Sequence, residues 1–368
     1  MPRRPALLLA LLMMSPMLSG CYLLQAAGGQ MQIVARREPI PELLADPATP
    51  EVLRKRLTYV AAAREFASRE LGLPDNESYR SYADVGRPFV VWNVFATPEF
   101  SVEPRRWCFP IAGCVVYRGY FSEDNAQDYA RSLRLRGDDT SVGGVSAYST
   151  LGHFKDPVLN TMMGWSDAQL AATLFHELAH QVAYVPGDSD FNEAFATVVE
   201  ETGLTRWLVS RGSDADLQAW QTQRKRYAEF VELLLATRER LAALYRLDLP
   251  VAEKRDRKQQ EFARLKLEYA ELRRRWNGYS GYDNWFARTL NNAHLVSAAT
   301  YHGCVPGLER LLAEVGNELP RFYERVRELA APAVKDERQA RCSLSPANVT
   351  SSGSISTGYT EYAKVGTE

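Results

Sequence analysis

Hydrophobic and polar residues alternate with a helical period over several stretches of the chain. Residues 51–72 carry apolar side chains three and four positions apart, which predicts an amphipathic helix. The same reasoning predicts helices over 122–136 and 284–330. Residues 22–50 have the pattern of a tether followed by a helix in Pro-rich surroundings.

Strands and a long helical hairpin are predicted from two other patterns. Runs rich in Val, Phe, Tyr and Trp predict strands over 88–96 and 114–121, and a glycine-bounded run predicts a third over 143–152. Residues 214–277 are dense in Arg, Lys, Glu, Gln and Leu and are interrupted at 247–250. This pattern is typical of a helical hairpin with a charged outer face, for which we expect the role of a solvated packing arm.

Two consecutive helices are predicted in the middle of the chain. Ser166 and Gln169 have the spacing of a capping box, so we expect a helix from there to about Tyr184, where a Pro-Gly pair follows. Asp190 is expected to cap the next helix, which runs to about Ser210.

The first of these helices contains the strongest chemical signal, His176-Glu177-Leu178-Ala179-His180. Residues four positions apart lie on one helical face, so both imidazoles can reach one metal ion. Glu177 is offset by one residue, so it lies beside the metal, where it can polarise a water molecule. The alternative is two histidines that merely face the core.

A catalytic zinc site needs a third protein ligand and one position open to water. Glu193 is the predicted third ligand, because the turn at 185–189 folds the second helix back and a Glu in its first turn can then face the metal. Asp188 and Asp190 are the alternative ligands. A histidine-histidine-glutamate set binds one zinc ion, with Glu177 as general base in the attack of water on a carbonyl.

The composition is that of a globular protein, with 46% hydrophobic and 24% charged residues. The 44 Lys and Arg nearly balance the 45 Asp and Glu, which gives no support to nucleic-acid binding or to a polybasic membrane contact. Only 5 His are present, so their clustering is informative. We expect His153 and His294 to be ordinary surface or core residues rather than ligands.

The N-terminus has the layout of a lipoprotein signal. Two arginines precede an apolar block at 6–14, and Leu-Ser-Gly then leads to Cys21. This predicts cleavage after residue 20 and a lipid on Cys21, which anchors the protein without spanning the bilayer. Tyr22 follows the cysteine, which indicates the outer membrane, facing the periplasm. The alternative is an ordinary signal peptide followed by a chance cysteine.

Four further cysteines are consistent with two disulfides in an oxidising compartment. Three pairings are open. Cys108 and Cys114 flank a short loop that contains Pro and Gly, so we expect them to pair, which leaves Cys304 with Cys342. Free buried thiols are the alternative, and no Cys-x-x-Cys spacing indicates a zinc site made by these residues.

The zinc motif followed by Asn192-Glu193-x-Phe195-Ala196 resembles the gluzincin metallopeptidases, and the latter run is similar to that of the large zinc aminopeptidases. From the lipoprotein signal onward, most of the chain resembles a family of bacterial lipoproteins described as putative aminopeptidases. The resemblance implies the same three zinc ligands and the same general base. The spacing from the second His to the ligand Glu is shorter than usual, and the Gly-Ala-Met-Glu-Asn run that binds the substrate amine is absent.

The resemblance also implies residues that contact the substrate. Gluzincins place an edge strand antiparallel to the substrate just before the metal helix, and 143–151 is the matching segment; an ordinary buried strand is the alternative. A downstream Tyr or His stabilises the oxyanion, with Tyr301 preferred over His302. The remaining candidates are Ala147, Tyr148 and Ser149 for substrate binding, Asn291 or Asn292 for substrate orientation, and Thr197 for holding a ligand His.

The sequence as a whole predicts an α+β, mainly α, zincin-like body with a small sheet. Its expected parts are a signal peptide (1–20), an N-terminal part with the sheet and zinc helices (21–212), a helical hairpin insertion (213–278), a helical part completing the site (279–342) and a loose tail (343–368). The expected function is a zinc peptidase, with aminopeptidase activity indicated by the resemblance. The alternatives are a zinc-binding scaffold or assembly lipoprotein without activity and a periplasmic endopeptidase acting on peptidoglycan cross-links. The oligomeric state is left open.

Overall fold

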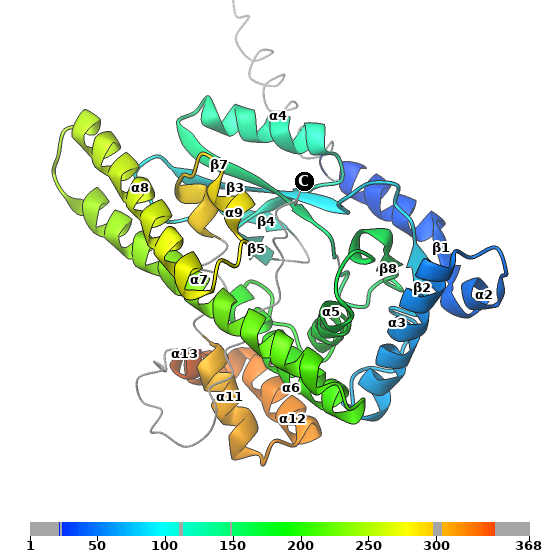
Figure 1. Cartoon of the computed structure of the whole chain (residues 1–368). Coiled ribbons are helices and arrows are strands. Elements are labelled where there is room, and N and C mark those ends of the chain that lie inside the picture. Colours follow the sequence, from blue (N-terminus) through cyan, green and yellow to red (C-terminus); the bar gives the residue numbers. More distant parts are fainter. Residues whose placement is uncertain (1–21, 23, 110–112, 148, 297–303, 343–368) are drawn as a thin grey trace, which may run out of the picture.

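The computed structural model describes residues 22, 24–109, 113–147, 149–296 and 304–342, and most of these are helical (Figure 1). A helix covers residues 24–35, where a tether was predicted. The physical reason is Ile33, which is 2% exposed and anchors this segment in the main hydrophobic core. Strand β1 (Arg37–Pro39) and helix α2 (Ile40–Ala45) follow.

The strands form two small sheets and a hairpin. Their bounds are β2 (Ser81–Ala83), β3 (Val91–Pro98), β4 (Trp107–Phe109), β5 (Gly113–Val115), β6 (Arg118–Tyr120), β7 (Asp138–Val145) and β8 (Val158–Leu159). In the first sheet β3 lies between β6 and β7, and both pairings are antiparallel. Helix α4 (Glu123–Arg134), which begins at the cap Ser122, lies along this sheet (Figure 1). In the second sheet β2 lies between β1 and β8, while β4 pairs with β5.

Strand β7 is shorter at its C-terminal end than the sequence predicted. It ends at Val145, so most of the run 143–152 is a loop. Asp156 explains the difference, because its carboxylate accepts hydrogen bonds from the backbone N–H and the hydroxyl of Thr150, at 2.9 and 2.7 Å. These bonds fold the chain back, and Leu151 takes a positive φ of 56°.

The central core is built on three helices, α3 (Glu51–Arg69), α5 (Asp167–His180) and α6 (Ser189–Ser210). Helix α5 is buried along almost its whole length, and α6 packs directly against it. Phe175 and Phe195 are fully buried in this core. The predicted capping box is present, since the Ser166 side chain accepts from Gln169 N–H and the Gln169 side chain bonds back to Ser166.

Two predicted helix boundaries between α5 and α6 were wrong. Helix α5 ends at His180, four residues before Tyr184, and the cap of α6 is Asp188 rather than Asp190. The side chain of Asn192 binds the backbone of Val185, so residues 181–185 are drawn into the connection instead of continuing the helix. The Asp188 carboxylate accepts from Phe191 N–H at 3.3 Å, which starts α6 earlier.

Helices α7 (Asp214–Arg246) and α8 (Val251–Arg275) form the long hairpin (Figure 1). Their apolar faces build a separate hydrophobic cluster, to which the short helix α9 (Asp283–Phe286) contributes. The hairpin is fastened to the first sheet by Lys258, whose ammonium binds the Asp139 carboxylate at 2.6 Å and the carbonyl of Glu99 at 2.8 Å. Within the described part of the chain, no helix combines the length and the apolar character needed to cross a membrane.

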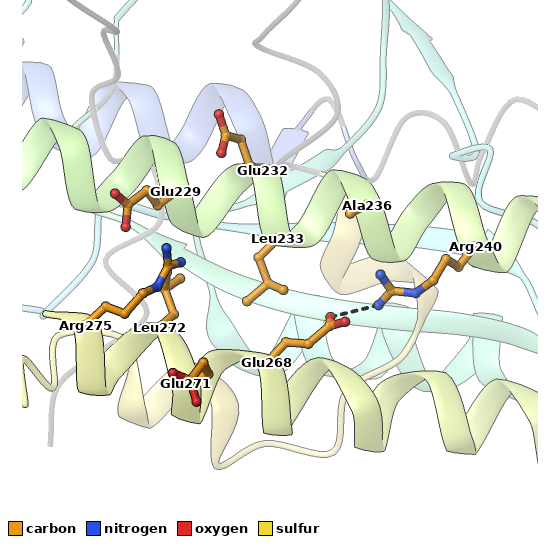
Figure 2. A pocket seen from close by; sticks show the side chains of 9 residues that line it. All are labelled: Glu229, Glu232, Leu233, Ala236, Arg240, Glu268, Glu271, Leu272 and Arg275. Carbon is orange, nitrogen blue, oxygen red and sulfur yellow. Dashed lines mark hydrogen bonds and ion pairs between the residues drawn. The ribbon is translucent and has the colours of Figure 1, made fainter.

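A groove of about 540 Å³ runs between α7 and α8, and Figure 2 shows that charged side chains line most of it. Its acids are largely paired: Arg240 binds Glu268 at 2.9 Å across the groove, and Glu229 accepts from the Trp276 indole at 2.7 Å. The groove is therefore part of the packing between the two helices.

The described C-terminal region is helical but interrupted, whereas the pattern over 284–330 predicted helix throughout. Its elements are η2 (Asn292–Leu295), α11 (Val305–Glu314), α12 (Leu319–Ala330), η3 (Pro332–Val334) and α13 (Lys335–Cys342); η1 (Asn160–Met162) is the third short 3₁₀ segment described. Both predicted disulfides are present, Cys108–Cys114 between β4 and β5 and Cys304–Cys342 between the start of α11 and the end of α13.

Candidate metal centre

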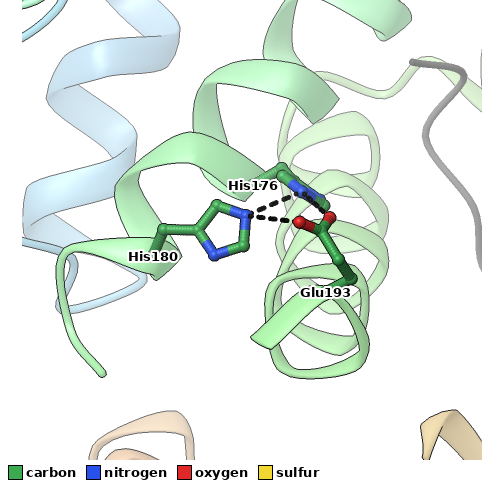
Figure 3. A group of neighbouring side chains, drawn as sticks. All are labelled: His176, His180 and Glu193. Carbon is green, nitrogen blue, oxygen red and sulfur yellow. Dashed lines mark hydrogen bonds and ion pairs between the residues drawn. The ribbon is translucent and has the colours of Figure 1, made fainter. Parts of the chain in front are cut away.

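The three predicted metal ligands meet between α5 and α6. His176 and His180 lie on one face of α5, and Glu193 reaches them from the first turns of α6 (Figure 3). The two Nε2 atoms are 3.2 Å apart. The Glu193 carboxylate places Oε2 at 3.3 Å from Nε2 of His176 and Oε1 at 3.8 Å from Nε2 of His180.

This spacing fits a single tetrahedral ion. Zinc bonds of about 2.0–2.2 Å place neighbouring ligand atoms about 3.3–3.5 Å apart, close to the separations between these three side chains. Within the described residues, these three are the group of His, Cys, Asp and Glu side chains close enough to share one ion. Both histidines are buried, and the Glu193 side chain is the most exposed of the three, at 23%.

The connection between the helices determines where Glu193 lies. The side chain of Asn192 accepts from Val185 N–H and donates to Val185 C=O, both at 2.8 Å. The alternative ligand Asp188 is used as the cap of α6 and forms an ion pair with Arg338 at 2.8 Å. Asp190, the other alternative, lies outside the three-residue group.

Replacing Asn192 with Ala is therefore expected to lower the free energy of unfolding by about 2–4 kcal/mol, because two buried backbone groups of Val185 lose their partners. Urea denaturation measures the loss. Equal stability of wild type and Asn192→Ala would rule out this role in holding the connection.

A residue that the sequence reasoning missed fixes the orientation of His176. Nδ1 of His176 lies 3.0 Å from Oε2 of Glu200, which is fully buried. A carboxylate on Nδ1 holds the proton there and leaves Nε2 free for a metal. Glu200 follows Glu193 by seven residues, about two helical turns, so both acids lie on the same face of α6. An acid at this spacing in an otherwise apolar helix is the sequence feature that could have indicated Glu200. Thr197 is buried one turn before it, and its predicted role stays a prediction.

Three carboxylates surround the two imidazoles, and their effects on protonation differ. Burial acts to lower the pKa of His176, but hydrogen bonds with Glu193 and Glu200 outweigh it and raise the pKa to about 10. Burial lowers the pKa of His180 to about 4. Burial also raises the pKa of Glu177 to about 8. Without a metal, His176 therefore carries a second proton at neutral pH, which a divalent cation bound at Nε2 would replace.

Glu177 lies beside a buried polar cluster that the sequence did not reveal. Tyr79 is 2% exposed and has an unusual positive φ of 63°. Asp156 is equally buried and accepts from Ser149 and Thr150. Tyr79 Oη and Glu177 Oε1 both lack a well-formed hydrogen bond within the described part of the chain.

The other predicted site residues are accounted for as follows. Asn291 and Asn292 use their side chains to hold η2 against the sheet and α7: Asn291 donates to Thr140 C=O, and Asn292 donates to Glu99 C=O and accepts from the Tyr245 hydroxyl. Ala147 is buried. Cys21, Tyr148, Tyr301 and His302 lie outside the described residues.

His153 is exposed, and among the described residues neither it nor His294 belongs to the group of three possible ligands. Nδ1 of His294 instead accepts from the backbone N–H of Asn291 at 3.2 Å. Burial, followed by the charge of Arg288, lowers the pKa of His294 from 6.5 to about 4. His294 is therefore neutral in the fold at neutral pH.

This shift predicts a loss of stability in mild acid. The unfolded chain binds a proton on His294 below pH 6.5, whereas the folded chain resists it until about pH 4, so stability is full above 6.5 and falls between these values. The expected loss is about 2 kcal/mol between pH 6.5 and 5. Urea denaturation at both pH values should show a smaller acid effect in His294→Gln. An identical acid effect in that variant would rule out His294 as its source.

Comparison with known proteins gives one match. The model of a family described as "Putative aminopeptidase" matches residues 21–341. No curated protein and no solved structure matches the chain.

Proposed function

The chain belongs to this family of putative aminopeptidases, and from that premise we propose that it is a zinc-dependent aminopeptidase with a zincin-like fold. The observation that carries the proposal is the convergence of His176, His180 and Glu193, with Glu177 adjacent to the first ligand. Because the family is one of putative peptidases, we propose that the substrates are peptides. The buried Glu177 favours catalysis over a purely structural ion, because a structural site needs no general base.

The proposed reaction assigns a role to each residue. His176, His180 and Glu193 would hold the metal, and a bound zinc ion would polarise the substrate carbonyl and make water more acidic. Glu177 takes a proton from the attacking water and delivers it to the leaving amine. Glu200 keeps His176 in the tautomer that presents Nε2 to the ion. We assign the stabilisation of the oxyanion to Tyr301, with His302 as the alternative.

The substrate is proposed to run along β7. Among the described strands β7 pairs only with β3, and we propose that the C-terminal half of its other edge takes the substrate by strand addition. Helix η2 packs against both β7 and β3, and Asn291 there binds the carbonyl of Thr140 in the N-terminal half of β7. The C-terminal half leads into the loop with Ser149, whose hydroxyl acts to lower the pKa of Glu177 and therefore lies beside it.

Exopeptidase and endopeptidase activity can be separated by assay. The protein lacking residues 1–21 is loaded with zinc and offered aminoacyl reporters with a free amine and N-terminally blocked peptides. The proposal expects cleavage of the free-amine reporters. Cleavage of blocked peptides alone would indicate an endopeptidase, for example one acting on peptidoglycan. Bound zinc with no cleavage of either class would indicate a scaffold.

We further propose that a lipid on Cys21 anchors the protein in the outer membrane, facing the periplasm. The support is the sequence ending in Leu-Ser-Gly-Cys after an apolar block. Labelling with a radioactive fatty acid tests it. The wild type should take up label and sediment with membranes, and Cys21→Ser should do neither; equal labelling of both would contradict the anchor.

A further inference from the structure

One buried cationic side chain of the helical hairpin contacts a helix of the candidate metal site. Arg224, from α7, is 6% exposed and makes a hydrogen-bonded ion pair with Glu201 of α6. Its Nη1 also lies 3.9 Å from Oε1 of Glu200. The guanidinium stacks over the ring of Trp220, 5.3 Å from the centroid, which restrains it in this position.

Glu200 lies between Arg224 and the metal centre and contacts both. One of its carboxylate oxygens, Oε1, faces the guanidinium, and the other, Oε2, lies 3.0 Å from Nδ1 of His176. Glu200 has no exposed surface, so its charge depends on nearby positive charge and hydrogen bonds. Arg224 therefore binds Glu201 through a hydrogen-bonded ion pair and Glu200 through a charge contact without a hydrogen bond.

We propose that Arg224 is a positioning residue of the metal centre: it holds Glu200 so that Glu200 fixes His176 with Nε2 directed at the ion. This inference rests on the proposed zinc site. It gives the hairpin a function, because the hairpin then completes the outer shell of the metal site instead of serving only as a solvated packing arm.

Lys258 offers a matched control. It is also a buried cation of the hairpin, 8% exposed, and it also binds a carboxylate of the main body, that of Asp139 at 2.6 Å. Asp139 lies in β7, not on a metal helix. Replacing Lys258 therefore removes a contact between the hairpin and the main body without touching Glu200.

The test measures zinc affinity by competition with a chromophoric chelator, using the chain without residues 1–21. Arg224→Met is expected to bind zinc about 10-fold more weakly than wild type, the lower end of the range for loss of a ligand's partner, because Arg224 acts through Glu200. Lys258→Met is expected to bind zinc as wild type does. Circular dichroism confirms that each variant is folded.

A second variant keeps the test decisive if Arg224→Met does not fold. In Arg224→Met/Glu201→Gln the buried carboxylate at 201 is also neutralised, so no unpaired charge remains there, while Glu200 still lacks its cation. The same weakening is expected. Wild-type zinc affinity in both variants that lack Arg224, or equally weakened zinc affinity in Lys258→Met, would overturn the role of Arg224 but not the proposed zinc site. A wild type that binds no zinc would overturn the proposed function and this inference with it.

Discussion

Replacing Glu177 with Gln is expected to lower kcat about 10²–10⁴-fold, the contribution typical of a general base, while the protein keeps its metal and its stability. Glu177 is almost fully buried, and Gln has the same shape as Glu, so the substitution preserves the packing. An amide cannot accept the proton of the attacking water. The zinc content, the melting temperature and KM should therefore stay close to the wild-type values.

Steady-state kinetics on a free-amine reporter, together with metal analysis of each preparation, checks this expectation. Asp190→Asn is the matched control, because Asp190 lies near Glu193 at the start of α6 but outside the ligand group. It should retain nearly full activity. Equal activity in wild type and Glu177→Gln would exclude Glu177 as the base.

Replacing Glu193 with Ala should weaken zinc binding by more than the about 10–100-fold that loss of an outer-shell contact costs, because a direct ligand is lost. Only His176 and His180 would remain, which is fewer than the three protein ligands of catalytic zinc sites. Activity at limiting zinc should disappear with the metal.

The measurement is a zinc titration of Glu193→Ala against wild type, with Asp188→Asn as control. Asp188 was an alternative third ligand, but it caps α6 and pairs with Arg338, so its replacement should cost stability and little zinc affinity. The reverse pattern, with zinc lost in Asp188→Asn and kept in Glu193→Ala, would mean that the third ligand was assigned wrongly.

Sequence spacing alone was sufficient to predict how the three proposed ligands come together. His176 and His180 are one turn apart, and a short turn between two helices leaves little choice for where Glu193 can lie. The length of that turn was predicted less well, because the contact from Asn192 to Val185 competes with continued helix, and helical periodicity does not include such a contact.

Residues from distant segments could not be predicted. Tyr79 and Asp156 reach the neighbourhood of Glu177 from loops, and neither lies in a periodic pattern or a motif. Arg224 is one of many arginines in a helix whose charged residues mostly face solvent, and only the packing of α7 on α6 distinguishes it. The hairpin itself was predictable, because its charge pattern and its break at 247–250 are local.

The most direct test of the central claim is anomalous diffraction at the zinc absorption edge, from crystals of the zinc-loaded protein. The proposed site predicts one strong peak between α5 and α6, within about 2.0–2.2 Å of Nε2 of His176, Nε2 of His180 and a carboxylate oxygen of Glu193. No peak there, or a peak bound by other side chains, would contradict it.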